Sequence, residues 1–328
     1  MPLALGRDSP LDSGELASVA DLIDIAGRLD GVTVAVVGGD RVEDLRLVES
    51  AADHGIVDRV ILVGRKDRIL RSVAEVGIEV RDDDIVAADD QQAAAAATVE
   101  LIEAGDADIV LKGNISTPVI NRHMLPLAVR KTVSLVTLFD AAPIADGRLM
   151  ILTDAGVTTN CTLDRMQHLV DNAVEVARTV LQIDRPRGAI LSANEKQVAS
   201  LPSTRMGADL AELDWPSAVV YGPLSFDLAT DPKSVAVKGL PDLPAAREVA
   251  GKADVLVCPG IDTANVLYKS IAAMNSYGLA SLASITIGFP VPYIILSRAD
   301  AVETRLASIA LCSIYAHQTA SRQDTNRR

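Results

Sequence analysis

The sequence predicts an α/β protein built around a mostly parallel sheet, and three observations favour this class. Apolar stretches with strand character alternate with stretches of helical periodicity, a rhythm typical of parallel sheets. Apolar residues make up 49% of the chain and aromatic residues only 3%, so Val, Ile, Leu and Ala must build the core. The length of 328 residues suggests about two domains.

The first half of the chain alternates between strand-like and helix-like segments. Residues 32–37 have the pattern of a buried strand that ends at Gly38, Gly39 and Asp40. Residues 42–54 carry apolar side chains at helical spacing. We expect the remaining elements of this half to be strands at 59–64 and 109–111 and an Ala-rich helix at 93–104.

The second half continues the alternation after a loop with turn residues at 142–147, which separates strand-like segments at 133–139 and 149–153. Apolar residues spaced by three and four predict a helix over 166–180. The remaining expected elements are strands near 189–192, 218–221, 255–258 and 285–287 and a last helix from Ala301 to about Gln318.

This order of elements predicts two α/β lobes. We expect the first lobe to be discontinuous and to comprise residues 14–140 and 299–320, because the last helix can pack back onto it. The second lobe is expected to span 141–298. The polar ends, 1–13 and 321–328, are predicted to be flexible.

Composition excludes several classes of function. A net charge of −13 argues against broad binding to nucleic acids or anionic membranes. The three cysteines are far apart and form no CxxC motif, which indicates reduced thiols in a cytoplasmic protein. We expect no signal peptide and no membrane span, and the four histidines lack the spacing of a metal site.

Ligands of parallel α/β sheets bind at the carboxyl ends of strands, and one strand end here is suited to anions. The apolar run 293–296 closes with Ser297-Arg298-Ala299-Asp300, and a helical pattern follows directly. A guanidinium group and a helix N-terminus both favour phosphate or carboxylate. The alternative is a surface arginine that pairs with Asp300 or Glu303.

Other strand ends also carry small, polar or basic residues. They include Lys112-Gly113-Asn114, Thr153-Asp154 and Gly222-Pro223. Lys112 could pair with a phosphate that Gly113 allows to approach the backbone, or it could be a surface lysine in a turn. The chain contains neither a P-loop nor a GxGxxG motif, which argues against a nucleoside triphosphatase or a standard nicotinamide enzyme.

Several motifs, taken together in this order, make the chain resemble the phosphate acetyltransferase and phosphate butyryltransferase family. They are Gly222-Pro223-Leu224-Ser225-Phe226-Asp227, residues 250–257, Asn265-Val266-Leu267-Tyr268-Lys269, the Ser297-Arg298 segment and residues 308–311. The chain is more similar to the butyryltransferase branch. This preference rests on Leu152-Thr153-Asp154-Ala155, Lys112-Gly113, Pro202-Ser203-Thr204 and the alanine after Ser297-Arg298.

The resemblance implies a fold and a reaction. The family has two lobes like those of isocitrate and isopropylmalate dehydrogenases, with the site in the cleft between them. It transfers an acyl group reversibly between coenzyme A and phosphate, with coenzyme A as a co-substrate and with no bound cofactor or metal. Its members form homodimers or larger homo-oligomers.

The resemblance also implies roles for individual residues. Arg298 is expected to hold the acyl phosphate and Ser297 to donate to the developing charge. Ser134 and Lys269 are expected to line the phosphate pocket, with Asn265 on the same wall. The other expected substrate contacts are Lys112, Gly113, Asn114, Thr153, Asp154, Gly222, Pro223 and Asp227.

One departure from the family leaves the general base open. Acetyltransferases of the family have an aspartate where this chain has Thr304, and a threonine cannot deprotonate a thiol at neutral pH. The candidates are Glu303, Asp300, or a positive pocket that lowers the pKa of the thiol without a base. The departure keeps an acyl-CoA-binding relative with impaired catalysis as an alternative, beside a dehydrogenase of the same fold and a different acyltransferase that uses coenzyme A.

Overall fold

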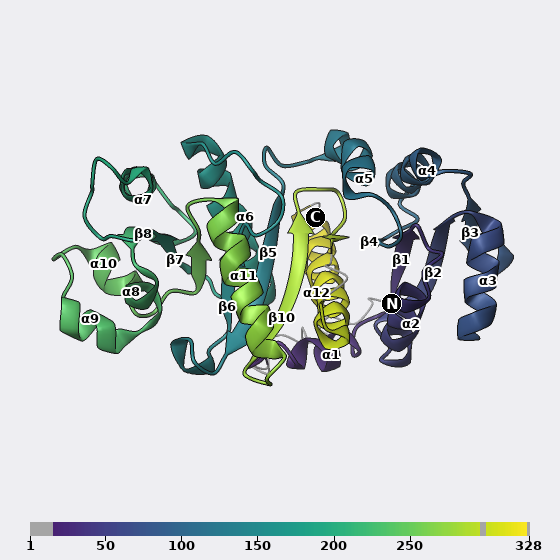
Figure 1. Cartoon of the computed structure of the whole chain (residues 1–328), viewed down its shortest axis with the longest axis horizontal. Coiled ribbons are helices and arrows are strands. Elements are labelled where there is room, and N and C mark those ends of the chain that lie inside the picture. Colours follow the sequence, from purple (N-terminus) through teal and green to yellow (C-terminus); the bar gives the residue numbers. More distant parts are fainter. Residues whose placement is uncertain (1–15, 296–299, 327–328) are drawn as a thin grey trace, which may run out of the picture.

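The structure is a computed structural model that describes residues 16–295 and 300–326. Within these residues, eleven strands form one sheet in the order β3-β2-β1-β4-β11-β10-β5-β6-β9-β7-β8 (Figure 1). The strands are β1 Val32–Val37, β2 Val57–Gly64, β3 Ile85–Ala87, β4 Ile109–Lys112, β5 Ser134–Ala141, β6 Met150–Thr153, β7 Arg187–Leu191, β8 Val219–Leu224, β9 Val255–Val257, β10 Ala280–Ile287 and β11 Tyr293–Ile294.

Helices cover both faces of this sheet (Figure 1). They are α1 Asp21–Ala26, α2 Val42–Asp53, α3 Lys66–Val76, α4 Gln91–Ala104, α5 Thr117–Met124, α6 Leu163–Val180, α7 Pro202–Ala211, α8 Phe226–Thr230, α9 Pro232–Lys238, α10 Pro244–Val249, α11 Ile261–Asn275 and α12 Val302–Asn326, with short 3-10 turns at Asp82–Asp84, Leu125–Leu127 and Ala145–Gly147. The α/β class and the mostly parallel sheet that the sequence predicts are confirmed.

Strand direction reverses in the middle of the sheet. β5 is antiparallel to both of its neighbours, β6 and β10, and β10 is antiparallel to β11. The strands from β3 to β11 therefore run parallel to one another, and the strands from β6 to β8 run parallel in the opposite direction. The strands of one group run toward the carboxyl ends of the strands of the other group.

The register places these ends at one level. One row of paired residues crosses the middle of the sheet through Leu135, Thr286, Tyr293 and Val110. Thr153, the last residue of β6, pairs with Val136, one residue along from this row. β4 ends at Lys112, two residues beyond Val110. Segments that follow β6, β11 and β4 are thus brought to the same level of the sheet.

Side chains along each strand point alternately to the two faces of the sheet, and the buried ones form three apolar clusters. In β10, Ile285 and Ile287 face the cluster under α1, α2, α6 and α12, whereas Leu282 faces the cluster under α8, α10 and α11. A third cluster, which contains Val37 and Val110, lies under α4 and α5. Because most strands are buried on both faces, their sequences are nearly continuous apolar runs.

The last helix, α12, holds the two ends of the described chain together. It packs against α1, α2, α6 and β10. Its Arg305 donates to the buried carboxylate of Asp44 in α2 at 2.5 Å, and Arg41 donates to the same oxygen at 2.6 Å. A buried carboxylate requires such partners, so this cluster fixes where α12 begins relative to α2.

The helix α12 also extends further than the sequence predicts, to Asn326 instead of about Gln318. The guanidinium group of Arg322 donates to Thr179 Oγ1 at 3.0 Å and to the Arg178 carbonyl at 3.2 Å. These contacts with α6 hold the last turns in place. The tail 321–328, predicted to be flexible, is helical as far as Asn326. The other segment expected to be flexible, 1–13, lies outside the described residues.

The boundary expected between the lobes falls at the end of β5, which stops at Ala141. The sheet itself continues across this boundary through the β5–β6 and β5–β10 pairs. The division into lobes at 140 and 141 stays a prediction. Over residues 16–295 and 300–326, none of the helices combines the length and the hydrophobicity that a membrane span requires.

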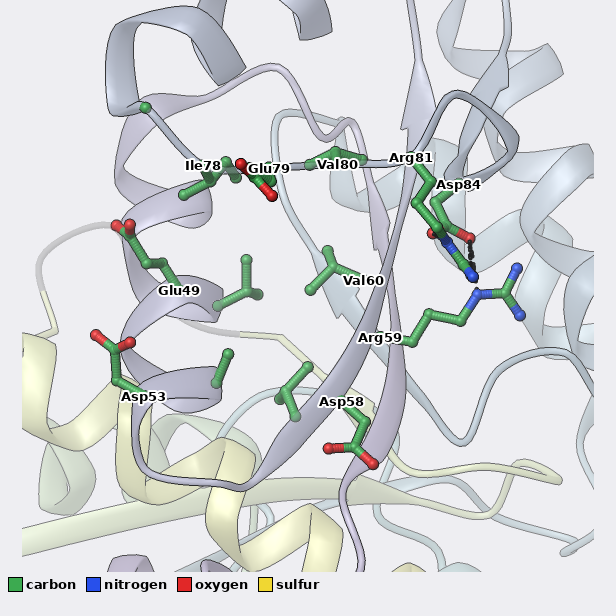
Figure 2. A pocket seen from close by; sticks show the side chains of 14 residues that line it. Glu49, Asp53, Asp58, Arg59, Val60, Ile78, Glu79, Val80, Arg81 and Asp84 are labelled. Atoms are coloured by element: carbon green, nitrogen blue, oxygen red, sulfur yellow. Dashed lines mark hydrogen bonds and ion pairs between the residues drawn. The ribbon is translucent and has the colours of Figure 1, made fainter.

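Asp84 anchors the segment that leads into β3 (Figure 2). Its carboxylate accepts from Arg81 Nε and from Arg59 Nε, both at 2.7 Å, and its side chain is only 6% exposed. The hydrogen bond from Arg81, and then the one from Arg59, lower the pKa of this carboxyl group. The arginine pair therefore stabilises the fold only while Asp84 is ionised.

We predict that Asp84→Asn reduces the acid sensitivity of the fold. A lowered pKa means that the stabilisation is present above the ordinary value of about 3.9 and is lost as pH falls through the lower pKa of the folded state. Urea unfolding between pH 7 and pH 3 should show the variant about 1–2 kcal/mol less stable at pH 7, with the difference shrinking below pH 4.

The matched control is Asp82→Asn, because Asp82 is two residues away but 80% exposed, in a surface pair with Lys66. This variant should follow the parent at every pH. A difference between Asp84→Asn and the parent that stays constant down to pH 3 would contradict the prediction.

Candidate functional site

Helix α11 carries the polar side chains of the site. Asn265, Tyr268 and Lys269 share one face because they are three and four residues apart. Asn265 Nδ2 donates to the Ala155 carbonyl at 2.9 Å, which ties the loop after β6 to the helix. The spacing of Asn265 and Lys269 was visible in the sequence, and the structure brings both to one cavity.

Asp300 lies beside this face of α11. The Tyr268 hydroxyl donates to Asp300 Oδ2 at 3.1 Å, and Lys269 Nζ lies 3.5 Å from Oδ1. The Asp300 side chain is 4% exposed, whereas that of Lys269 is 47% exposed. Burial and then the Asp300 carboxylate raise the pKa of Tyr268 above its usual range, so the phenol keeps its proton and acts as a donor.

These residues enclose a cavity of about 190 Å³ between α11 and the sheet. Its floor comes from three neighbouring strands, through Leu135 on β5, Ser284 on β10 and Ile295 after β11. The remaining lining residues are Ala155, Gly156, Val157, Asn265, Tyr268, Lys269 and Asp300. The cavity thus combines an ammonium group and a carboxylate with an apolar surface.

Asp154 lies beneath the surface of this cavity and holds the loop after β6 that lines it. Its carboxylate accepts from the backbone amides of Leu135, Gly156, Val157 and Thr158 at 2.9–3.2 Å. Burial raises the pKa of the Asp154 carboxyl group, while the four amides act in the opposite direction. The side chain is 3% exposed and Thr153 is fully buried, so both predicted contacts lie under the cavity surface.

Ser134 lies on the opposite face of the sheet from the cavity. Its neighbour Leu135 lines the cavity, and side chains alternate along a strand. Ser134 is fully buried, and its Oγ accepts from Asn172 Nδ2 of α6 at 2.8 Å. The structure therefore does not bring Ser134 together with Lys269.

Asn114, which follows Lys112 and Gly113, lines a different cavity, of about 260 Å³. Asn114 Nδ2 donates to Asp40 Oδ1 at 3.0 Å, which joins the loops that follow β4 and β1. A side chain at Gly113 would meet the Gly38 carbonyl at 2.6 Å, so only glycine fits. Lys112 ends β4 directly beside β11, the strand that leads to Ile295 and Asp300.

The segment Gly222-Pro223 and the nearby Asp227 lie away from both cavities. They belong to β8 and α8, and β8 is three strand positions from β6, or roughly 14 Å. A side chain at Gly222 would meet Ile190 Cβ at 2.7 Å, so close packing explains this glycine. Asp227 accepts from Lys238 Nζ at 2.8 Å, and this bond lowers the pKa of the carboxyl group.

Ser297 and Arg298 lie outside the described residues, so their predicted roles rest on the sequence. Glu303 is exposed in the first turn of α12. Thr304 is buried, and its Oγ1 accepts from Asn275 Nδ2 of α11 at 3.1 Å. Of the two carboxylates considered as bases, Asp300 is the one that the cavity lining includes.

Five residues of the cavity lining had no role predicted from the sequence: Tyr268, Ser284, Leu135, Val157 and Ile295. Tyr268 stands within the quoted motif, and its distance of three residues from Asn265 could have placed it on the same helix face. Ser284 is a hydroxyl in the middle of an apolar strand, which is a weaker signal. Nothing in the sequence marks the three apolar residues, because their contribution depends on the strand register.

A wider groove of about 680 Å³ lies between α2, β2 and residues 77–81 (Figure 2). The carboxylates of Glu49, Asp53, Asp58 and Glu79 surround it, and its arginines are paired with Asp84. Such a groove repels phosphate groups. The described residues include no group of three or more His, Cys, Asp or Glu side chains suited to bind a metal ion.

The thiols of this chain are poor nucleophiles. Burial raises the pKa of Cys258 to about 12 and also raises the pKa values of Cys161 and Cys312. Thiolates, and not thiols, attack carbonyl groups. The charged side chains in the lining of the cavity are those of Lys269 and Asp300.

Comparison with known families identifies the group of proteins to which this architecture belongs. The family described as phosphate acetyl/butaryl transferase matches residues 67–313, which is most of the chain. The chain belongs to this family. The family predicted from the sequence motifs is therefore confirmed.

Individual relatives of the family agree with this membership. A phosphate butyryltransferase of Clostridium acetobutylicum is 34% identical over 87% of this chain and 93% of that protein. A phosphate acetyltransferase of Rhizobium meliloti is 31% identical over 83% of this chain and 85% of that protein. The crystal structure of a branched-chain phosphotransacylase from Enterococcus faecalis V583 has a TM-score of 0.72 and 30% identity, and covers 87% of this chain and 99% of that one.

We predict that Asp154→Asn destabilises the protein by about 1–3 kcal/mol. An asparagine must present its NH₂ group where one carboxylate oxygen now accepts a backbone amide, so two donors face each other. Urea unfolding at pH 7 measures the loss. The control Asp209→Asn changes a carboxylate that is 41% exposed, and it should alter stability by less than about 0.5 kcal/mol. Equal stabilities of the two variants would refute the prediction.

Proposed function

We propose that this protein transfers a short-chain acyl group between coenzyme A and inorganic phosphate, converting acyl-CoA and phosphate into acyl phosphate and CoA. The observation that carries the proposal is the cavity beneath α11 in a chain of the phosphate acetyl/butaryl transferase family. The cavity offers an ammonium group and an apolar surface side by side. An acyl phosphate has a charged end and an apolar end, and it fits such a lining.

The protein must assist the proposed reaction in three ways. In the direction from acyl phosphate and coenzyme A, the thiol must lose its proton, the carbonyl oxygen must be stabilised as it becomes negative, and the phosphate must be held. In the opposite direction phosphate attacks the thioester, and the same proton returns to the departing thiolate. We assign the phosphate to Lys269 and Arg298, and the carbonyl oxygen to Ser297. The roles of Ser297 and Arg298 in this proposal come from the sequence resemblance.

We propose Asp300 as the group that accepts the proton of the thiol. Its carboxylate belongs to the cavity lining, whereas Glu303 is exposed on α12. The hydroxyl of Tyr268 and the ammonium group of Lys269 orient the carboxylate. Lys269 also favours a thiolate nearby, because a positive charge stabilises the ionised thiol.

The remaining residues that were predicted to contact the substrate also have roles in the proposal. We propose that the cavity that Asn114 lines, just after Lys112 and Gly113, receives a more distant part of coenzyme A; its charged lining residues are Arg65, Arg68, Asp40, Asp89 and Asp90. Asp154 has an indirect role in this proposal, because its carboxylate holds the loop after β6 in place. A cytoplasmic location and a homo-oligomeric state stay predictions from the sequence.

The test of the function is the release of free thiol from butyryl-CoA on addition of phosphate. We expect release in the parent, and about a tenfold loss of kcat/KM in Lys269→Gln, because a charge-assisted hydrogen bond to phosphate is removed. The loss should appear mainly in the KM for phosphate. Lys252→Gln, which changes an exposed lysine elsewhere, should behave as the parent.

Two results would contradict the proposed function. Binding of coenzyme A without any phosphate-dependent thiol release would indicate an acyl-CoA-binding relative. Reduction of NAD or NADP in place of acyl transfer would indicate a dehydrogenase of related architecture.

The identity of the base can be tested through the dependence of kcat/KM on pH. In the direction from butyryl phosphate and coenzyme A, where the thiol must lose its proton, we expect Asp300→Asn to lower kcat/KM about 100-fold and to change its dependence on pH. Glu303→Gln should keep the rate and the pH profile of the parent. If Asp300→Asn keeps both, a lowered thiol pKa without a dedicated base explains the reaction instead.

A further inference from the structure

The cavity beneath α11 has an apolar part that the proposed reaction leaves unexplained. Leu135, Val157 and Ile295 line it, and they come from β5, from the loop after β6 and from the end of β11. We infer that these three side chains, here called the acyl wall, bind the acyl chain of the substrate and limit its length. This inference rests on the proposed function and specifies its substrate.

The position of the acyl wall suits this role. The polar residues of the same lining are Asn265, Tyr268, Lys269, Ser284 and Asp300, so a substrate whose phosphate contacts Lys269 places its acyl chain on the remaining, apolar surface. In the sheet, Ser284 on β10 pairs with Thr137 on β5, and Leu135 lies two residues before Thr137 on the same face. Polar and apolar groups therefore share one small floor.

The cavity is small, with a volume of about 190 Å³. The acyl carbonyl, the reacting phosphate and the acyl chain must share this space. We therefore expect it to favour an acyl chain of a few carbon atoms over a long fatty acyl chain.

The acyl wall is held rigidly, and a flexible wall could not select chain length. The carboxylate of Asp154 accepts from the amides of both Leu135 and Val157, so it fixes two members of the wall relative to each other. A side chain at Gly156 would meet Leu135 Cδ2 at 2.8 Å, so Leu135 already fills the space beside the loop. Val157 and Ile295 are β-branched, which restricts their rotamers.

Val157 is the member best suited to a test, because it is only partly buried in a loop, and a change in its size leaves the central sheet intact. The experiment measures kcat/KM with acetyl-, propionyl-, butyryl-, pentanoyl- and hexanoyl-CoA at saturating phosphate. For Val157→Ala we expect the ratio of hexanoyl-CoA to butyryl-CoA to rise about tenfold, as for one or two methylene groups in an apolar pocket.

A second variant tests the opposite direction. Val157→Phe fills the cavity, so kcat/KM should fall about tenfold for butyryl-CoA and much less for acetyl-CoA. The matched control is Val60→Ala, since Val60 is a partly buried valine in the distant groove of Figure 2. It should keep the chain-length profile of the parent. Thermal unfolding of each variant checks that the fold is retained.

The outcomes separate the inference from the proposed function. If the parent releases no thiol from any of the five acyl-CoA substrates, the proposed function fails. If the parent is active but both Val157 variants keep its chain-length profile within twofold, the acyl wall is wrong and the function stands. Opposite shifts in the two variants, with an unchanged control, support the inference.

Discussion

The reversal of strand direction at β5 and β10 is the constraint on which the rest of the structure depends. Three antiparallel pairs in the middle of the sheet join two parallel groups that run in opposite directions. Carboxyl ends that would otherwise lie along one edge instead meet at a common level. The cavity beneath α11 forms there, from the loop after β6, the end of β11 and a helix that follows β9.

Local pattern was enough to predict much of this molecule from its sequence. The strand at 32–37 is a continuous apolar run, and Asn265 and Lys269 are spaced to share a helix face, so the fold class and two cavity residues followed directly. Ser134 and Leu135 show where such reasoning ends. One residue decides which face of β5 a side chain occupies, and that depends on pairing with distant β10 and β6.

Other residues show that a polar or small residue near a strand end can serve the packing of the protein instead of contacting a ligand. Asp154 had the appearance of a ligand contact, but four backbone amides surround its carboxylate. Gly222 lies within β8, three strand positions from β6, and its lack of a side chain is explained by packing against Ile190. Neither the order of strands in the sheet nor the demands of nearby amides can be read from residue types alone.

The buried contact between Asp44 and Arg305 has a consequence for the biosynthesis of the protein. The two residues are 261 positions apart, so α2 emerges from the ribosome long before its partner exists. At about 5–20 residues per second, the wait exceeds roughly ten seconds. During this time the surface that α12 later covers is exposed to solvent, and the amino-terminal half is open to chaperones or to aggregation until the final helix arrives.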